Sequence, residues 1–394
     1  MIFSPRFSVP RRVAITACGC VCPLGIGWRA IHDALLHGED HISPIHSFDT
    51  SRCQCTTAGQ VDDAQLAPAG SRRWHRATRM LFTVLQEAHA LHPSFKPEIC
   101  FMATTCGGMS FGEEFFRQHA HSQRHSPARL ASYLPMQPVQ DALLSLGWNL
   151  PSYLISNACA SGTNAIGLAS WAIRSGRYRR VLCGAYDAFS QLVFAGFESL
   201  KIMTPEKCRP FDAARTGLVL GEGAAVFFLE DLEEAAHRGT PILAEIAGYG
   251  VASDNHHLTQ PEPTGAMVRL AIRRALADAD FSPQSIDYIN AHGTGTLQND
   301  ASEGQALLDF LPDVPVSSTK AMMGHALGAA GAIEAAFCLH ALEGNFLPPN
   351  INLRQKEKAL NLVVNSSRPA SIRRVLSNSF GFGGANACIA LQKV

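Results

Sequence analysis

Cys159 is the residue best placed to act as a nucleophile. It lies in Asn-Ala-Cys-Ala-Ser-Gly (157–162), between an apolar run typical of a buried strand and a helical pattern. Small neighbours let a substrate approach the sulfur closely, and the N-terminal end of a helix favours a thiolate, which lowers the pKa of a cysteine. Most cysteines at arbitrary positions are buried and inert, so other residues must decide between the two interpretations.

Two histidines stand where apolar runs open into glycine-rich turns. His292 follows the run 286–289 in Asn-Ala-His-Gly-Thr-Gly-Thr (290–296), and His325 follows Gly324 in a second strand-to-helix turn. Strand ends present functional side chains in α/β proteins, and the hydroxyls of Thr294 and Thr296 suit a polar ligand arm. One such histidine could be structural, but two favour a catalytic pair.

Two charged residues lie within reach of these turns. Lys320 stands five residues before His325, and Glu334 stands nine residues after it. Either side chain could hold and polarise an imidazole, or could be solvated at the surface. Lys320 lies in the uncharged run 314–327, where a buried ammonium without a partner would be costly.

A glycine-rich loop near the C-terminus carries two aromatic residues. Residues 378–386 read Asn-Ser-Phe-Gly-Phe-Gly-Gly-Ala-Asn, with Phe380 and Phe382 between the glycines. Its backbone amides could stabilise an oxyanion, and its phenylalanines could gate a hydrophobic pocket. The loop lacks the Gly-Lys-Ser/Thr ending of a phosphate-binding loop.

The elements that must position these residues alternate along the chain. Apolar runs predict strands at residues 12–18, 98–103, 152–156, 180–184, 224–230, 242–249, 286–290, 314–318, 376–378 and 387–392. Helical periodicity lies between many of them, at residues 28–36, 76–91, 163–175, 266–279, 300–308 and 329–342. The alternation favours a layered α/β architecture.

The pattern also indicates a loose internal duplication. The strand before Cys159 runs into a turn and a small-residue helix, and the strand 314–318 runs in the same way into the turn of His325. We therefore predict two related halves, residues 1–235 and 236–394, joined near 232–240.

Composition excludes several classes of protein. Hydrophobic residues make up 46% of the 394 residues and charged residues 17%, which is enough apolar material for a large core and unlike a disordered chain. Lys plus Arg and Asp plus Glu balance at 33 each, so no overall basic field favours nucleic acid. No apolar run reaches the roughly 18 residues of a membrane span.

The cysteines and the N-terminus indicate an intracellular protein. Twelve cysteines are scattered through the chain, which fits a reducing cytoplasm better than a disulfide scaffold. Cys18, Cys20 and Cys22 have one-residue gaps, unlike zinc ligands, so we expect no metal. The run 13–21 after two arginines resembles an export signal, but its Thr, Gly and Cys residues and the following Pro-Leu-Gly favour a buried strand.

Four blocks together resemble the β-ketoacyl-acyl-carrier-protein synthases, in particular their elongating type II branch. These are Asn-Ala-Cys159-Ala-Ser-Gly, Asn-Ala-His292-Gly-Thr-Gly-Thr, Lys320-Ala-Met-Met-Gly-His325 and Asn-Ser-Phe-Gly-Phe382-Gly-Gly, and their order and spacing match. Weaker similarity covers nearly the whole chain. The resemblance implies a thiolase-like fold, an α/β fold whose two related halves form a five-layered α-β-α-β-α arrangement, usually as a dimer.

The resemblance also implies a chemistry. Cys159 would take an acyl group from an acyl-carrier protein, with its own amide and that of Phe382 forming the oxyanion hole. His292 and His325 would promote decarboxylation of malonyl-carrier protein and stabilise the enolate that attacks the acyl thioester. No cofactor is implied beyond the phosphopantetheine arm, which arrives on the carrier protein.

Supporting roles follow from the same matching. Lys320 would orient His325, with Glu334 supporting the network. Phe382 would be the gate. A substrate-binding set would comprise Thr294 and Thr296, which would contact the phosphopantetheine arm, Phe197, which would line the acyl channel, Phe380, and Asp300, which would belong to the site's polar support. A histidine rather than asparagine at position 325 argues against the priming branch.

Several alternatives stay open. Asn157 stands where Thr is common in the family, Ala385 replaces a frequent Thr, and the region 90–106 is shortened. These departures leave fatty-acid synthesis and a polyketide or polyene pathway both open, with a homodimer or a heterodimer. The second functional class is a chain-length partner subunit, against which the complete Cys-His-His set argues. A thiolase would carry a catalytic cysteine near the C-terminus, and Cys388 lies outside a matching block.

Overall fold

The computed structural model describes residues 10–70, 74–124 and 127–394. Residues 1–9, 71–73 and 125–126 of the predicted first half lie outside the described residues.

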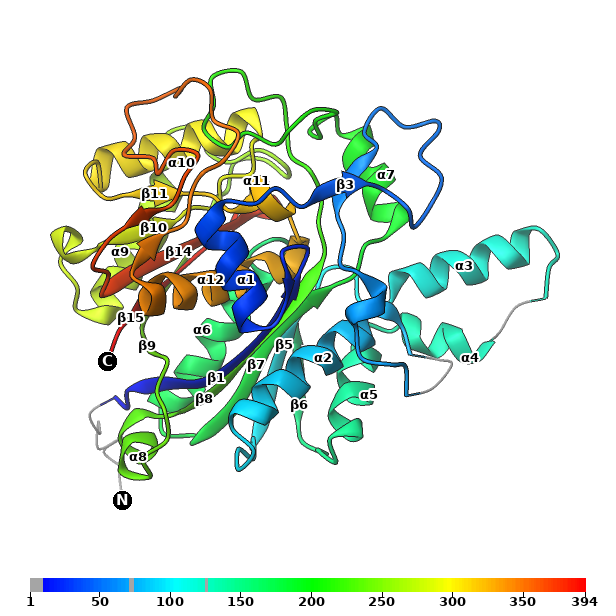
Figure 1. Ribbon diagram of the computed structural model, residues 1–394, viewed down its shortest axis with the longest axis horizontal. Coiled ribbons are helices and arrows are strands. Elements are labelled where there is room, and N and C mark those ends of the chain that lie inside the picture. The colour runs from blue at the N-terminus through cyan, green and yellow to red at the C-terminus, as the bar shows by residue number, and fades with distance from the viewer. Residues whose placement is uncertain (1–9, 71–73, 125–126) are drawn as a thin grey trace.

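Two half-sheets with the same strand order form the centre of the molecule (Figure 1). The first has the order β1-β8-β7-β5-β6, from β1 (Val13–Cys22), β5 (Ile99–Ala103), β6 (Ser152–Ile155), β7 (Arg180–Asp187) and β8 (Gly223–Asp231). The second has the order β9-β15-β14-β10-β11, from β9 (Ala244–Ser253), β10 (Tyr288–Asn290), β11 (Val316–Ser317), β14 (Arg374–Gly381) and β15 (Ala385–Gln392).

Strand directions match between the halves as well as strand order. Within each half-sheet the first two neighbouring pairs are antiparallel and the next two are parallel. The half-sheets meet at β1 and β9, through the pairs Ala14 with Glu245 and Ile15 with Ala244. The predicted duplication is therefore confirmed in the topology of the sheet, while the division at residues 235 and 236 stays a prediction.

Helices cover and separate the half-sheets, which confirms the five-layered α-β-α-β-α fold. On the outer face of the first half-sheet lie α2 (Arg76–Leu91) and α5 (Gln137–Ser145), and on that of the second lie α9 (Ala266–Ala279) and α10 (Leu297–Phe310). The middle layer consists of α6 (Ser161–Arg174) and α12 (Ala330–Gly344).

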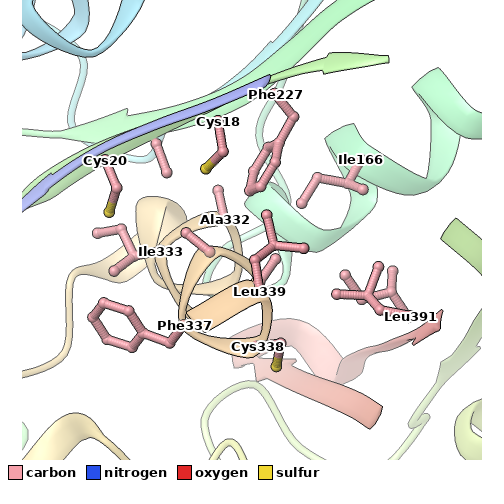
Figure 2. Close-up of a cluster of buried hydrophobic side chains, with 14 of the residues drawn as sticks. Cys18, Cys20, Ile166, Phe227, Ala332, Ile333, Phe337, Cys338, Leu339 and Leu391 are labelled. Carbon is pink, nitrogen blue, oxygen red and sulfur yellow. The ribbon is translucent and has the colours of Figure 1, made fainter. Parts of the chain in front are cut away.

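The middle layer explains the small residues of both helices. Ala332 and Ile333 of α12 face Cys18 and Cys20 of β1, and Phe337 belongs to the same buried cluster (Figure 2). A helix that is apolar all round is suited to a position between two sheets. All twelve cysteines are free, and the triplet at the end of β1 fills this core as small apolar side chains.

Short elements complete the fold. They are β2 (Gly25–Ile26), α1 (Trp28–His37), β3 (Ile42–Pro44), β4 (Thr57–Gly59), α3 (Met109–Ala120), α4 (Pro127–Leu130), α7 (Gln191–Ser199), α8 (Leu232–His237), α11 (Lys320–Met323), β12 (Phe346–Leu347) and β13 (Arg368–Pro369). Short 3₁₀ turns lie at Asp63–Gln65, Ala131–Tyr133, Pro283–Ser285, Leu327–Ala329 and Phe382–Gly384. In the described ranges, no helix has the length and apolar character to cross a membrane.

Candidate active site

Cys159 lies in a strained turn between β6 and α6. Ala158 has φ 46, a left-handed conformation that costs a residue other than glycine about 1–2 kcal/mol. The Ser161 hydroxyl stabilises the turn, because it accepts from the Asn157 amide at 2.7 Å and donates to the Ala158 carbonyl at 2.6 Å. The turn holds Cys159, 7% exposed, just before the first turn of α6.

The thiol of Cys159 differs from the sequence-based expectation. Burial raises its pKa to about 12, and the carboxylates of Asp187 and Glu334 act in the same direction. The charge of Lys320 and the Phe382 amide oppose this rise in pKa without overcoming it. The expectation of a lowered pKa is therefore wrong, because desolvation outweighs the nearby positive charge.

His292 and His325 face each other beside Cys159. Their ring centroids lie 5.3 Å apart at an interplanar angle of 83°, and their side chains are 3% and 1% exposed. Burial lowers the pKa of both imidazoles well below the usual value, and the Lys320 charge lowers it further. Both rings are therefore neutral near pH 7 and can donate a hydrogen bond without carrying charge.

Lys320 contacts His292 rather than His325. Its ammonium donates to the His292 carbonyl at 2.5 Å, lies 3.3 Å from His292 Nδ1 and pairs with the Glu334 carboxylate. The expectation that Lys320 orients His325 is thus corrected. Lys320 follows β11, and His292 follows the neighbouring parallel strand β10, so the two turns lie side by side.

This contact also determines the tautomer of His292. An ammonium offers only donors, so Nδ1 of His292 accepts from it and Nε2 carries the proton. Burial raises the pKa of Glu334 to about 7, and the Lys320 charge opposes this rise in pKa.

Two buried carboxyl groups escaped the sequence reasoning. Glu303 of α10 accepts from the amides of His292 at 2.9 Å and Gly293 at 2.8 Å, and from the Asn378 side chain at 3.2 Å. Asp187 ends β7 and accepts from the Cys106 amide at 2.6 Å, on the loop after β5. Burial raises their pKa values to about 7 and about 6, respectively. Asp187 could have been predicted as a site residue, because it is a charged residue at the end of an apolar run in the sequence.

The glycine-rich loop closes over the sulfur. The Phe382 amide donates to Cys159, and a Cβ at Gly381 would lie 2.9 Å from the Cys159 nitrogen. Only glycine allows this close approach. The Phe382 ring stacks on Phe197 at 5.7 Å and 16°, and Phe380 packs 5.6 Å from the His292 ring.

One pocket is lined by most of the residues that the sequence predicted to be catalytic or substrate-binding. Its lining includes Cys159, His292, Thr294, Thr296, His325, Phe197, Phe380 and Phe382, together with a covering segment that contributes Asp254 and residues 257–261. The Thr294 and Thr296 hydroxyls lie 2.9 Å apart. Lys320 and Glu334 lie behind the histidines and do not line the pocket.

Asp300 is not part of the pocket lining, which corrects its grouping with the substrate-binding residues and leaves it the role of polar support. It is fully buried in α10, and its carboxylate accepts from the Phe211 amide at 2.7 Å and the Gly295 amide at 3.2 Å. Arg215 lies 3.7 Å away. Asp300 therefore positions the loop that carries Thr294 and Thr296.

In the described part of the chain, no cluster of three His, Cys, Asp or Glu side chains could hold a metal.

The repeated halves and the Cys-His-His pocket define a thiolase-like condensing fold, and solved structures agree. The ishigamide ketosynthase/chain length factor structure matches with a TM-score of 0.92 and 31% identity, over 98% of this chain and 100% of that one. A type II polyketide acyl-carrier protein in complex with its ketosynthase matches with a TM-score of 0.89 and 28% identity, over 98% and 100%.

The chain belongs to the beta-ketoacyl synthase family. The family's N-terminal domain matches residues 10–235 and its C-terminal domain matches residues 243–354. A 3-oxoacyl-[acyl-carrier-protein] synthase 2 from Synechocystis is 34% identical, covering 97% of this chain and 98% of the relative. The tetracenomycin polyketide synthase ketoacyl synthase alpha subunit from Streptomyces glaucescens is 35% identical, covering 97% of each.

Proposed function

We propose that this chain is a 3-oxoacyl-acyl-carrier-protein synthase, which condenses a Cys159-bound acyl chain with malonyl-carrier protein. The observation that best supports this proposal is that one pocket brings together the Cys159 thiol and two neutral imidazoles, those of His292 and His325. A chain-length partner subunit is the alternative, since a structural neighbour pairs a ketosynthase with such a factor. The complete Cys-His-His set favours the catalytic subunit.

The first half-reaction is an acyl transfer. The Cys159 sulfur attacks the thioester carbonyl on the carrier protein's phosphopantetheine arm, and the Phe382 and Cys159 amides stabilise the oxyanion. The carbon–sulfur bond to the arm breaks, and the thiol proton of Cys159 ends on the departing arm. Because burial raises the pKa of Cys159, this proton leaves only as the new bond forms.

The second half-reaction uses the histidines. The His292 Nε2–H and the His325 imidazole donate to the thioester oxygen of malonyl-carrier protein, so that the enolate forms as carbon dioxide leaves. The enolate carbon attacks the acyl carbonyl on Cys159, the bond between that carbon and the Cys159 sulfur breaks, and the departing thiolate takes one proton from solvent. Thr294 and Thr296 line the approach and suit the polar arm. Neutral donors match an oxygen whose charge develops during the reaction.

We also propose a dimer, as a homodimer or with a related chain. Among the described strands, β6 pairs on one side only. The exposed apolar residues of this region are Tyr153 of β6, Leu168 and Trp171 of α6, and Val251 of β9, which are 57, 39, 62 and 40% exposed. Leu168 and Val251 line one hollow with Ile155 of β6. An open edge beside exposed apolar side chains is typical of a pairing surface. The free state of all twelve cysteines supports a cytoplasmic location.

Mass spectrometry of the intact protein, offered acyl-carrier protein with a loaded acyl chain, tests the first half-reaction. We expect one acyl adduct, which Cys159→Ala abolishes and Cys53→Ser leaves intact. Cys53 is the matched control because it is the more accessible thiol. An adduct that survives Cys159→Ala, or no adduct with or without a related partner chain, would sink the proposal.

A further inference from the structure

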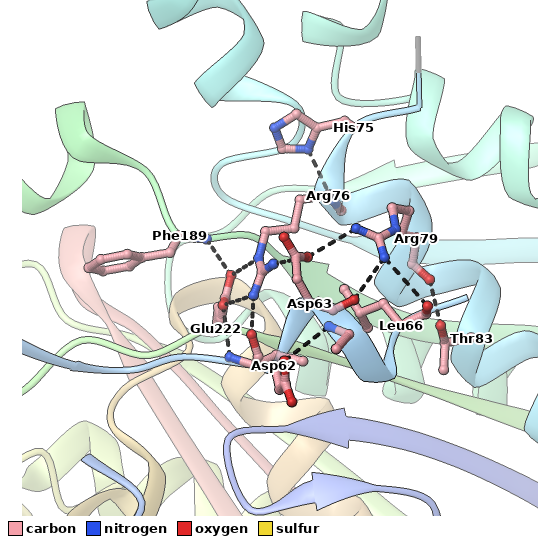
Figure 3. A network of polar contacts seen from close by, with 12 residues as sticks. Asp62, Asp63, Leu66, His75, Arg76, Arg79, Thr83, Phe189 and Glu222 are labelled. Atoms are coloured by element: carbon pink, nitrogen blue, oxygen red, sulfur yellow. Dashed lines mark hydrogen bonds and ion pairs between the residues drawn. The ribbon is translucent and has the colours of Figure 1, made fainter. Parts of the chain in front are cut away.

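Glu222 is a buried carboxylate that the proposed mechanism does not use. It is 1% exposed and lies just before β8. One carboxylate oxygen accepts from the Val61 amide at 2.9 Å and from Arg76 at 2.6 Å, and the other accepts from Arg76 at 3.0 Å and the Phe189 amide at 2.9 Å (Figure 3). Four donors from three segments therefore converge on one side chain.

The residues directly before Glu222 hold the main chain of His325. The His325 amide donates to the Val219 carbonyl at 2.7 Å, and the Gly221 amide donates to the His325 carbonyl at 2.9 Å. Leu220 and His325 thus form a parallel bridge. The position of this catalytic residue depends on the position of the segment 219–221.

On its other side, the segment 219–221 contacts the segment 59–61, which Glu222 also binds. The Gly59 amide donates to the Leu220 carbonyl at 2.8 Å, and Glu222 binds Val61 two residues later. A Cβ at Gly59 would lie 1.8 Å from the Met323 carbonyl oxygen, so the segment 59–61 is in direct contact with the turn that carries His325. A shift of the segment 59–61 would displace that turn.

We propose that Glu222, held by Arg76, is a positioning residue for His325. Its carboxylate holds the segment 219–221 and the segment 59–61 in a fixed position relative to each other. That position determines where the His325 imidazole lies. Glu222 touches neither substrate nor imidazole. The inference rests on the proposed function, because it assigns Glu222 to the decarboxylation step in which His325 acts.

Glu222→Gln tests this role, because it keeps the side chain's shape and removes its charge. Its amide group must face a donor, either Arg76 or a backbone N–H, so at least one hydrogen bond is lost. We expect carbon dioxide release from malonyl-carrier protein by the acylated enzyme to fall about 10–100-fold, the scale of a small misplacement of a catalytic group. Acylation of Cys159 should stay within about twofold.

Two further variants complete the test. Asp63→Asn removes the charge of Asp63, a 64% exposed partner of the same guanidinium, and it should leave both half-reactions unchanged. Arg76→Lys keeps the charge but loses the two-point contact, so it should reproduce the selective loss even where Glu222→Gln fails to fold. Equal losses in both half-reactions, or no loss, would overturn the inference. A wild-type enzyme lacking both half-reactions would instead overturn the proposed function.

Discussion

Lys320 and Glu334 are fully buried, so each charge depends on the other. We expect Lys320→Met to lower the free energy of unfolding by roughly 3 kcal/mol, because it leaves the Glu334 carboxylate without its cation. The double variant Lys320→Met/Glu334→Gln should regain much of that stability, since both charges are then gone. Urea unfolding of the single and double variants measures this coupling.

Activity should not return with stability. The double variant lacks the ammonium that contacts the His292 ring and carbonyl, so malonyl decarboxylation should remain low while the protein is folded. Glu334→Gln alone is the matched single change. A double variant as unstable as Lys320→Met, or one with normal decarboxylation, would contradict the assigned role of Lys320.

At the scale of elements, equivalent strand ends of the two halves build the site. The first half contributes the turn after β6, with Cys159, and the second contributes the turns after β10 and β14, with His292 and Phe382. Asp187 at the end of β7 and Lys320 after β11 support this site without lining the pocket. The carboxyl ends of neighbouring parallel strands open along one edge, which brings residues distant in sequence into one pocket.

The contact between α1 and α12 carries a pH-dependent prediction. The ring of His340 in α12 lies 3.7 Å from that of Trp28 in α1, centroid to centroid, at an interplanar angle of 30°. Burial lowers the pKa of His340 to about 3, and the nearby His32 lowers that pKa by a smaller amount. Below pH 6.5 the His340 imidazole gains a proton in the unfolded chain but stays neutral in the folded chain. The free energy of unfolding therefore decreases as the pH is lowered. Relative to His340→Phe, wild type should lose about 2 kcal/mol between about pH 7.5 and pH 5.

Urea unfolding at both pH values measures this difference. His37→Gln is the control, because His37 is exposed at the end of α1. It should change with pH as wild type does. Parallel pH profiles for wild type and His340→Phe would show that this histidine is not the source of the loss.

At the scale of the whole molecule, the free edge of β6 lies beside the Cys159 turn, so the proposed dimer interface would lie next to the proposed nucleophile. We expect Tyr153→Lys and Trp171→Glu to reduce dimer formation at least tenfold, because each places a charge on the apolar edge face. Analytical ultracentrifugation, alone or with a related partner chain, measures the change.

Leu91→Glu provides the comparison for that experiment. Leu91 is 59% exposed at the end of α2, away from the edge, so its variant should associate as wild type does. A dimer that resists both edge changes, or that Leu91→Glu disrupts equally, would place the interface elsewhere.

The ten predicted strands all form, but their ends differ from prediction. Strand 376–378 extends to Arg374–Gly381, because a full hairpin with β15 pairs eight residues. Strand 314–318 shortens to Val316–Ser317, because its pairing with β10 covers only two residues. Apolar patterns therefore located the strands, and partners in space determined their lengths.

The sequence alone was sufficient to predict the layered α/β class, and it located the candidate nucleophile, the two candidate imidazoles and the glycine-rich loop, because local patterns and four spaced blocks carry that information. Only the tertiary structure decided that Lys320 contacts His292, that Asp300 supports a loop and that the pKa of Cys159 is raised. It also decided that the segment directly before Glu222 pairs with the main chain of His325. Hydrogen bonds and pKa values depend on which distant segments become neighbours and on how deeply they are buried, and neither is encoded in residue spacing.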